Sequence, residues 1–171
     1  MIGIVPQKAV LFKGTIRHNM QWRDKNATDE DIWNALDIAQ AKDFVEKKPD
    51  KLDEMILQEV KNLSGGQRQR LTIARALVGD PEILILDDSA SALDLATDAR
   101  LRKAIHEKTS GMTVFIVSQR ISSIKSADKI IVLDDGKIAG IGTHSELYKG
   151  CEVYKEICLS QLSEKEAQAN G

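Results

Sequence analysis

Leu63-Ser64-Gly65-Gly66-Gln67-Arg68-Gln69-Arg70-Leu71 is the most informative stretch of this chain of 171 residues. The apolar spacing that follows it predicts a helix over 67–78. Two consecutive glycines let a ligand approach the backbone with no Cβ in the way, and Ser64 adds a capping hydroxyl. Because a helix N-terminus presents unpaired N–H groups and a positive dipole end, this arrangement suits a phosphate. A Ser-Gly-Gly by itself is typical of a flexible turn, so the whole string carries the argument.

A second informative segment lies about twenty residues further on, where the apolar run Ile83–Leu86 ends in Asp87 and Asp88. The run predicts a buried strand. Ligands of open α/β sheets bind at the carboxyl ends of the strands, and a carboxylate there can hold Mg²⁺, usually through water. An acid after a strand can also cap the next helix, so the two carboxylates are candidates for a metal site.

Short apolar runs bounded by turn residues predict the fold. We interpret three of them as buried strands of a mostly parallel sheet: Ile83–Leu86, Val114–Val117 and Ile130–Leu133. The helical spacing of Leu95–Lys108 between the first two gives a βαβ pattern, which predicts an α/β fold with both faces of the sheet covered. Asp135-Gly136 predicts a tight turn, after which Lys137–Gly142 returns as an antiparallel edge strand.

The stretch from about 28 to 59 predicts a helical insertion. Thr28 followed by three acids indicates a helix start, and a second helix is expected around Ala41–Lys47, ending before Pro49. We therefore divide the chain into one partial domain over 1–162, with a helical subdomain at about 14–80, and a flexible, frayed tail over 163–171.

Composition excludes several classes of protein. Lys plus Arg number 24 against 26 for Asp plus Glu, a net charge of -2. A nucleic-acid binder usually has a basic excess, so no nucleic-acid partner is expected, although a local basic patch is not excluded. No apolar run approaches the roughly 20 residues that span a bilayer, and the first residues hold no signal sequence. Cys151 and Cys158 make no disulfide framework and are expected to be buried, reduced thiols.

The chain resembles the nucleotide-binding domain of ATP-binding cassette (ABC) transporters from about Ile2 to Leu159. Leu63–Leu71 matches the signature motif of that family, and Ile83–Asp88 resembles its Walker B motif. Val5-Pro6-Gln7 looks like the Q-loop and Ser91-Ala92-Leu93-Asp94 like the D-loop. Leu11–Arg17 is similar to a stretch found in exporter-type cassettes, and 135–147 to the closing hairpin and helix start. The resemblance implies an α/β fold of the P-loop NTPase type with an inserted helical subdomain.

The resemblance also implies a role for each matching residue, with ATP and Mg²⁺ as cofactors. Ser64, Gly65, Gly66 and Gln67 would contact nucleotide, and Asp87 would bind the metal. Gln7 would sense Mg²⁺ and the attacking water and couple to a transmembrane partner. Asp94 would lie at the dimer interface, where it could also cap the following helix. Asp88 and Gln119 would take the catalytic positions.

Three departures from the family pattern qualify this reading. First, no Gly-x-x-x-x-Gly-Lys-Ser/Thr occurs in the chain, so the phosphate-gripping P-loop is missing and we expect the chain to be the C-terminal part of a longer polypeptide. Second, Asp88 stands where the family usually has a catalytic Glu, and a misplacement of about 1 Å can cost on the order of 10²-fold in rate. Third, Gln119 replaces a His. The Gln amide can donate a hydrogen bond, but it carries no charge.

A smaller departure is 58–62, where exporters commonly have glycines. Glu59 in this stretch is a candidate contact to the coupling elements of the transmembrane partner, or part of a solvated loop.

Asp87, Asp88 and Gln119 would serve one ATP site, whereas 64–67 would serve the opposite site of a head-to-tail dimer. We therefore expect the ATPase part of an exporter, with a degenerate site of its own and an intact signature for a partner that is a non-identical cassette. The isolated chain would not hydrolyse ATP. It would sit at the cytoplasmic face of the membrane, bound to the coupling helices of a transmembrane domain. Two alternatives are a non-hydrolytic regulatory or dimerisation module, favoured by the missing P-loop, and a DNA-repair or chromosome-condensation ATPase, disfavoured by the absence of long heptads.

Overall fold

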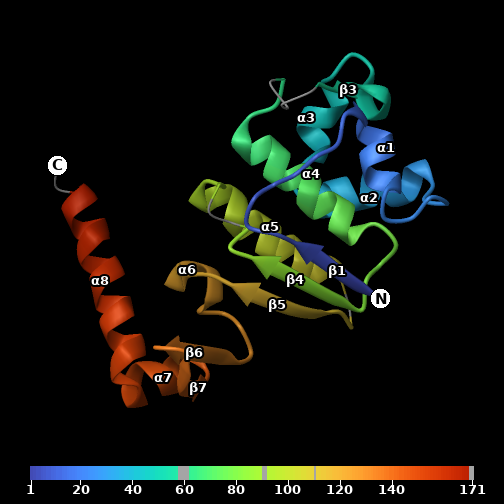
Figure 1. The fold of residues 1–171 in the computed structure, drawn as a ribbon. Coiled ribbons are helices and arrows are strands. Elements are labelled where there is room, and N and C mark those ends of the chain that lie inside the picture. The colour runs from blue at the N-terminus through green and yellow to red at the C-terminus, as the bar shows by residue number, and fades with distance from the viewer. Residues whose placement is uncertain (58–61, 90–91, 110, 170–171) are drawn as a thin grey trace. The chain divides into compact units, whose positions relative to one another are not determined.

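The computed structural model describes residues 1–57, 62–89, 92–109 and 111–169, and for 162–169 it describes the backbone only. The chain divides into two compact units, Met1–Val117 and Ser118–Gly171. Figure 1 labels the elements of both.

A parallel sheet of three strands forms the base of the first unit. Its strands are β1 (Ile2–Val5), β4 (Ile83–Asp87) and β5 (Thr113–Val117), in the order β1-β4-β5. The register pairs Val5 with Leu86, and Asp87 with Val117. The carboxyl ends of the three strands therefore lie at one edge of the sheet. Helix α5 (Leu95–Lys108) connects β4 to β5, which confirms the βαβ pattern expected from the sequence.

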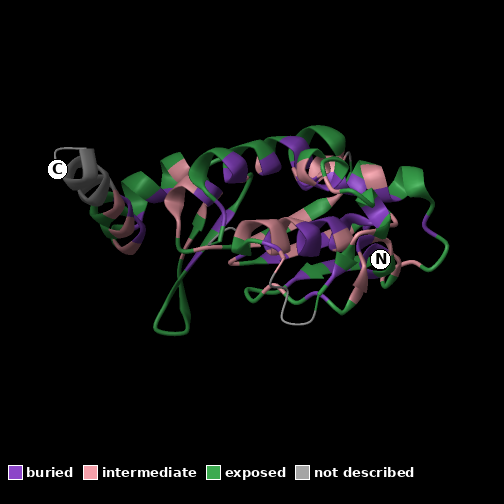
Figure 2. Cartoon of the chain, turned by 90° about the horizontal axis from the view of Figure 1, so that it is seen from above, coloured by how far each residue is buried: buried purple, intermediate pink, exposed green. Residues whose placement is uncertain are grey.

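The two faces of this sheet differ in burial. Val5, Leu84 and Leu86 are buried in one hydrophobic cluster with residues of helices α4 and α5. On the opposite face, every second side chain along a strand is exposed, and the alternation is visible along the strands in Figure 2. These are Ile2, Ile4, Phe115 and Val117, each more than half exposed. The expectation of a sheet covered on both faces is therefore wrong for the described residues of the first unit, because the helices of that unit pack on one face only.

Four helices make up most of the region expected as a helical subdomain. They are α1 (Ile16–Gln21), α2 (Asp29–Ile38), α3 (Lys42–Glu46) and α4 (Gly65–Leu77). A 3-10 turn, η1 (Lys51–Asp53), follows α3, and the short strands β2 (Gly14–Thr15) and β3 (Met55–Ile56) pair antiparallel. The predicted helix start at Thr28 is confirmed: Thr28 and Asp31 form a reciprocal capping box at the N-terminus of α2.

The second unit is built on a hairpin. Strands β6 (Ile130–Asp134) and β7 (Lys137–Gly142) pair antiparallel. Asp135 and Gly136 connect them with φ values of 45° and 72°, which is the left-handed pair that a tight hairpin turn needs. Ile130 and Val132 pack with Leu147 and Tyr154 of the helices α7 (His144–Gly150) and α8 (Glu152–Ala169). Helix α6 (Ile121–Ile124) precedes the hairpin.

Three sequence predictions can be compared with this unit. Ile130–Leu133 is a strand, but it pairs with β7 in a separate sheet and not in the parallel sheet with β4 and β5; apolar content alone does not distinguish the two pairings. Helix α8 continues over 163–169, where the sequence predicts a frayed tail, since Glu, Lys, Ala and Gln in that segment favour a helix. Cys151 and Cys158 are free and buried, as expected.

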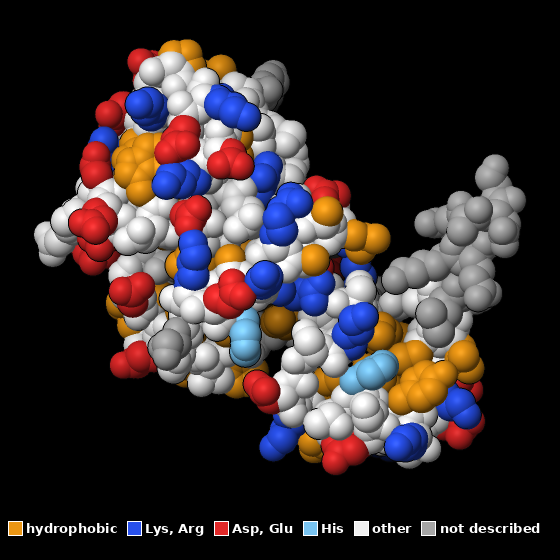
Figure 3. Space-filling view, turned by 180° about the vertical axis from the view of Figure 1, so that it is seen from behind, with side chains coloured by type: hydrophobic (Ala, Val, Ile, Leu, Met, Phe, Trp, Pro, Cys, Tyr) orange, Lys and Arg blue, Asp and Glu red, His pale blue; other side chains and the backbone are white. Residues whose placement is uncertain are grey.

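Charged residues of both signs are mixed on the surface. Figure 3 shows Lys and Arg side chains interspersed with Asp and Glu over the face that it draws. This mixing agrees with the near balance of 24 basic and 26 acidic residues.

Candidate functional site

The glycine pair lies at the first turn of helix α4, as the sequence predicts. Ser64 is the N-cap, with an extended backbone at φ −68° and ψ 163°. Its Oγ accepts a hydrogen bond from the Gln67 amide at 3.2 Å, and the Gln67 Oε1 accepts one from the Ser64 amide at 3.0 Å. This capping box satisfies two of the unpaired donors of the helix end. The remaining amides and the positive dipole end can still meet an anion.

The two glycines of the motif are not equally constrained by this chain. A Cβ on Gly65 would meet nothing nearer than the Arg68 guanidinium at 4.0 Å, whereas one on Gly66 would lie 3.4 Å from the Ala92 carbonyl oxygen. Both have ordinary backbone angles, since neither is among the residues with positive φ. Gly65 is exposed, so the described contacts give no reason for a glycine there. Gly66 brings the start of α4 against the loop that precedes α5.

The carboxyl end of β4 brings Gln7 and Asp88 together. Gln7 follows β1, and its Nε2 donates a hydrogen bond to Asp88 Oδ2 at 3.3 Å. Asp87 ends β4 on the uncovered face of the sheet and is exposed, while Asp88 is half-buried. The Asp88 amide donates to the Val117 carbonyl at 2.9 Å, which ties this residue to the neighbouring strand. The Gln7–Asp88 hydrogen bond thus joins the residue after β1 to the residue after β4.

Asp88 has a φ of 41°, in the left-handed region that only Gly, Asn, Asp and a few others adopt readily. The turn after β4 thus favours Asp over a longer acid at this position. Sequence inspection alone does not reveal this backbone constraint.

Asp94 is the N-cap of helix α5. Its carboxylate accepts hydrogen bonds from the Thr97 amide at 2.8 Å and from the Thr97 hydroxyl at 2.7 Å. These bonds hold the pKa of Asp94 below its usual value, with the backbone bond as the main cause. The capping alternative that the sequence left open is therefore present, and it does not prevent a role at an interface because Asp94 is exposed.

Gln119 belongs to the second unit, two residues after β5 ends. Its side chain is exposed, and its carbonyl oxygen accepts a hydrogen bond from Gln161 Nε2 at 2.6 Å. Two other sequence predictions, the Glu59 contact and the Ser91 end of the D-loop segment, fall outside the described residues.

Arg70 of α4 has contacts that were not predicted from the sequence. Arg70 Nη1 donates to the Gln40 carbonyl at 2.7 Å, and its guanidinium lies 4.9 Å from the centre of the Phe44 ring. Burial lowers the pKa of Arg70. This residue links α4 to the chain between α2 and α3. Its signal in the sequence is the second arginine of Gln67-Arg68-Gln69-Arg70.

The donor set at the end of β4 fits Mg²⁺. Asp87 and Asp88 supply carboxylate oxygens and Gln7 an amide oxygen, the hard donors that Mg²⁺ prefers. Among the described residues, no three His, Cys, Asp or Glu side chains converge on a point.

Comparison with known families identifies the class. Residues 1–91 match the ABC transporter family model, and the chain belongs to that family. Its fold is the α/β fold of the ABC ATPase, since it superposes on a bacterial Atm1-family ABC exporter with ATP bound at a TM-score of 0.89 and 35% identity, over 94% of this chain and 28% of that one.

Two relatives give the same picture. The chain is 44% identical over 98% of its length to the uncharacterized ABC transporter ATP-binding protein YfiB of Bacillus subtilis (strain 168), and 41% identical over 95% to a protein of Rickettsia felis that is by name an export ATP-binding/permease protein. It spans 29% and 28% of their lengths. Among the described residues, we find no helix with the length and apolarity needed to cross a membrane.

Proposed function

We propose that this chain is the ATP-binding part of an ABC exporter and that it works in a head-to-tail pair with a second cassette. The observation that carries the proposal is the open first turn of α4: a capped, exposed helix end whose Gly65 has no packing role among the described residues. In such a pair these amides would contact the phosphates of an ATP held mainly by the partner. Exporter-like relatives and the ATP-bound structural neighbour support this reading.

Mg²⁺ would bind at the carboxyl end of β4, near Asp87 and Gln7. The metal would neutralise charge on the phosphates during phosphoryl transfer. Asp87 lies on the uncovered face of the sheet and is exposed, so that it can bind the metal through water. Gln7 already donates its amide N–H to Asp88, which leaves its oxygen for the ion or for an attacking water. Because the chain contains no P-loop sequence, we propose that it binds ATP tightly only in an assembly that supplies one.

With Asp88 and Gln119 at the two catalytic positions that the family resemblance implies, ATP hydrolysis by this cassette would be slow. The Asp88 carboxylate is one methylene shorter than that of a Glu, its backbone is held in the left-handed region, and its Oδ2 accepts from Gln7. The shorter side chain and the hydrogen bond from Gln7 both limit the reach of this carboxylate towards a water. Gln119 offers a hydrogen-bond donor without charge. We therefore propose a heterodimeric exporter in which the partner cassette, completed by 64–67 of this chain, carries most of the turnover.

The partners in this proposal are a non-identical cassette and the coupling helices of a transmembrane domain, which would keep the chain at the cytoplasmic face of the membrane. A non-hydrolytic regulatory module is the second candidate, favoured by the missing P-loop and by the substitutions at 88 and 119.

The test uses the complete transporter. One of its two catalytic sites is inactivated at a time, so that turnover at the other site is measured alone. Asp88→Glu with Gln119→His should raise turnover at the site of this chain by on the order of tenfold or more, since a correctly placed acid–base group contributes 10²–10⁴-fold. Gly65→Ala should instead lower turnover at the partner site. If the double substitution leaves turnover unchanged, the degenerate-site reading is wrong. If Gly65→Ala also has no effect, the chain contributes to neither site and the regulatory module is favoured.

A further inference from the structure

A polar cavity of about 230 Å³ lies in the first unit where helices α2 and α3 meet α4 and α5. We call it the α2–α5 cavity, and none of its lining residues is among those assigned to ATP or Mg²⁺. Pockets for drug-sized ligands have roughly 300–1,000 Å³ and are mostly apolar. Here every lining residue is polar or charged: Asp37, Gln40, Lys42, Asp43, Arg70 and Arg100. The size and the lining therefore favour a small, polar ligand.

Two arginines supply hydrogen-bond donors to this cavity. Arg70 donates from Nη1 to the Gln40 carbonyl at 2.7 Å and from Nε to the Gly66 carbonyl at 3.4 Å. Arg100 Nη2 donates to Thr97 Oγ1 at 3.0 Å. Because a guanidinium has five N–H donors, each arginine keeps further N–H groups for which the described residues offer no acceptor. Guanidinium groups held in this way can bind an oxyanion through paired hydrogen bonds.

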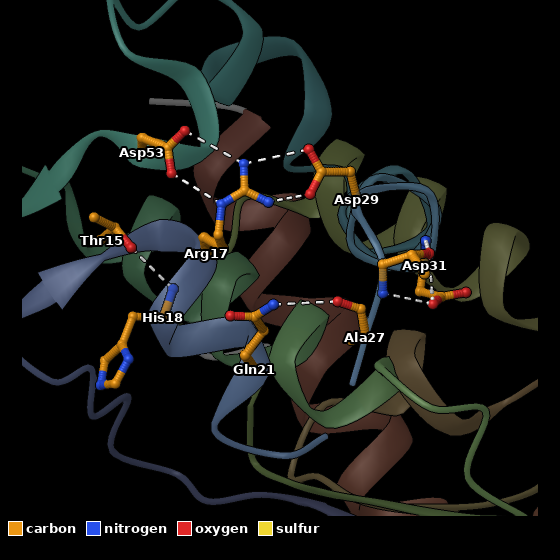
Figure 4. A network of polar contacts seen from close by, with 9 residues as sticks. Thr15, Arg17, His18, Gln21, Ala27, Asp29, Asp31 and Asp53 are labelled. Atoms are coloured by element: carbon orange, nitrogen blue, oxygen red, sulfur yellow. Dashed lines mark hydrogen bonds and ion pairs between the residues drawn. The ribbon is translucent and has the colours of Figure 1, made fainter. Parts of the chain in front are cut away.

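Neither guanidinium forms an ion pair within the described part of the chain. Arg17 shows the contrast, since Asp29 and Asp53 both bind its guanidinium, as Figure 4 shows. Arg70 is half-buried; burial is the main cause that lowers its pKa, and the positive charge of Arg100 lowers this pKa as well. A charge withdrawn from water without an opposite charge beside it is costly. A bound anion would therefore stabilise the two arginines.

The acids near the two arginines do not neutralise them by direct contact. Asp94 caps helix α5, and Asp37 binds Lys108 of the same helix. Asp43 forms no ion pair in the part of the chain that the structure describes. Asp94 and Asp43 raise the pKa of Arg70 through their charge alone, with no hydrogen bond to it. Since three cations and two carboxylates line the α2–α5 cavity, positive charge is in excess there.

We propose that the α2–α5 cavity binds a phosphate group, free or carried on a small polar molecule, between Arg70 and Arg100. A phosphate has a charge near −2 at neutral pH and three strong acceptor oxygens or more, so it accepts from both guanidiniums at once. A single carboxylate has one charge and two oxygens, which suits one guanidinium. Asp43 and the space left in the cavity suit hydroxyl groups on the molecule that carries the phosphate. This site goes beyond the proposed ATPase role and does not depend on it.

The test is isothermal titration calorimetry of the whole chain without nucleotide, at constant ionic strength, with inorganic phosphate, glycerol 3-phosphate and succinate as probes. Both phosphate probes should bind about tenfold or more tightly than succinate. Tighter binding of glycerol 3-phosphate assigns the site to a phosphate ester, whereas equal affinities assign it to free phosphate. Arg100→Gln should weaken the binding of inorganic phosphate about tenfold, because a charge-assisted hydrogen bond is lost. Asp43→Asn should tighten it about two- to fivefold, because an opposing charge is removed.

Lys103→Gln and Glu107→Gln are the matched controls, because they change the net charge by the same amounts on exposed residues of α5 that do not line the cavity. Each should leave the affinity for inorganic phosphate within about twofold. These comparisons locate the site, since the first turn of α4 can also meet a phosphate. Arg100 is exposed, so its substitution leaves the fold intact, which circular dichroism checks.

Three results would overturn the proposal. In the first, neither phosphate probe binds at millimolar concentration, or succinate binds as tightly as they do. In the second, Lys103→Gln weakens phosphate binding as much as Arg100→Gln. In the third, Asp43→Asn fails to tighten it. Because no nucleotide is present, none of these failures bears on the ATPase proposal.

Discussion

At the scale of single residues, glycines that look alike in the sequence have different physical reasons. A Cβ on Gly3 would lie 2.5 Å from the Ala76 carbonyl oxygen, so β1 can approach the end of α4 only with a glycine there. Gly65 has open space around its Cβ position. Gly3 is therefore required by packing inside this chain, whereas among the described residues nothing lies closer than 4.0 Å to a Cβ on Gly65.

Gly65→Ala and Gly3→Ala form a matched pair of substitutions. We expect Gly65→Ala to leave the free energy of unfolding unchanged or to raise it by up to about 1 kcal/mol, because Ala favours a helix. Gly3→Ala should lower it by about 1–3 kcal/mol through overpacking against backbone. Urea denaturation followed by circular dichroism measures both. Equal destabilisation by the two substitutions would contradict the packing argument.

Asp88 is the second residue whose backbone decides what it tolerates. With φ at 41°, Asp88→Asn should change the free energy of unfolding by less than about 0.5 kcal/mol, because Asn adopts the left-handed region as readily as Asp. Asp88→Val should cost about 1–2 kcal/mol, since a β-branched residue is strained there. The same urea measurement applies. A Val variant as stable as the Asn variant would show that the turn relaxes.

At the scale of elements, side-chain caps define where helices begin. Helices α2, α4, α5 and α7 each start after an N-cap whose side chain accepts from the backbone: Thr28, Ser64, Asp94 and Thr143. Three carboxylates take part in these caps. Hydrogen bonds from Thr28, Thr97 and Thr143 hold the pKa values of Asp31, Asp94 and Glu146 below their usual values.

A carboxylate whose pKa is lower in the folded than in the unfolded protein makes the stability of the fold depend on pH in a definite direction. The contribution of such a carboxylate is complete above its unfolded pKa, which is 3.8 for Asp94, and it is lost as pH falls through the lower folded value. Asp94→Asn keeps a capping oxygen but cannot titrate. We expect wild type to lose more stability than this variant between pH 5 and about pH 2, with similar stability for both at pH 7. Thermal unfolding across that pH range tests this, and superimposable pH profiles would contradict it.

At the scale of the whole molecule, the main feature is an uncovered apolar sheet face. Ile2, Ile4, Phe115 and Val117 share this face of the first unit, and each is 53–61% exposed. Among the described residues β5 pairs only with β4, so one of its edges is open. An exposed apolar face beside an open edge favours association with further chains.

We therefore expect the purified chain to self-associate as its concentration rises. Phe115→Lys with Val117→Lys should shift the sedimentation profile towards the monomer, because charge on the face opposes stacking. Leu57→Lys with Leu95→Lys is the matched control, since both leucines are more than half exposed but lie outside the sheet. A chain that stays monomeric at every concentration, or a control that dissociates it equally, would contradict this expectation.

Several features followed from the sequence alone because they depend on local chemistry. The cap at Thr28, the helix Leu95–Lys108, the turn at Asp135 and the strand–carboxylate end at Asp87 were all predicted, since each rests on residues a few positions apart. The family assignment rested on the same kind of evidence, a continuous run from Leu63 to Leu71.

Other features depend on residues far apart in the chain, and only the tertiary structure decided them. Three contacts bring together segments that are separate in the chain: Ile130–Leu133 with β7, Gln7 with Asp88, and Phe12 with Trp22 and Arg75. The exposure of one face of the parallel sheet depends on such long-range packing too. Apolar spacing states that a strand or helix will bury one face, but it does not state against which partner. That choice is made by long-range packing, which covers some faces of this chain and leaves others open.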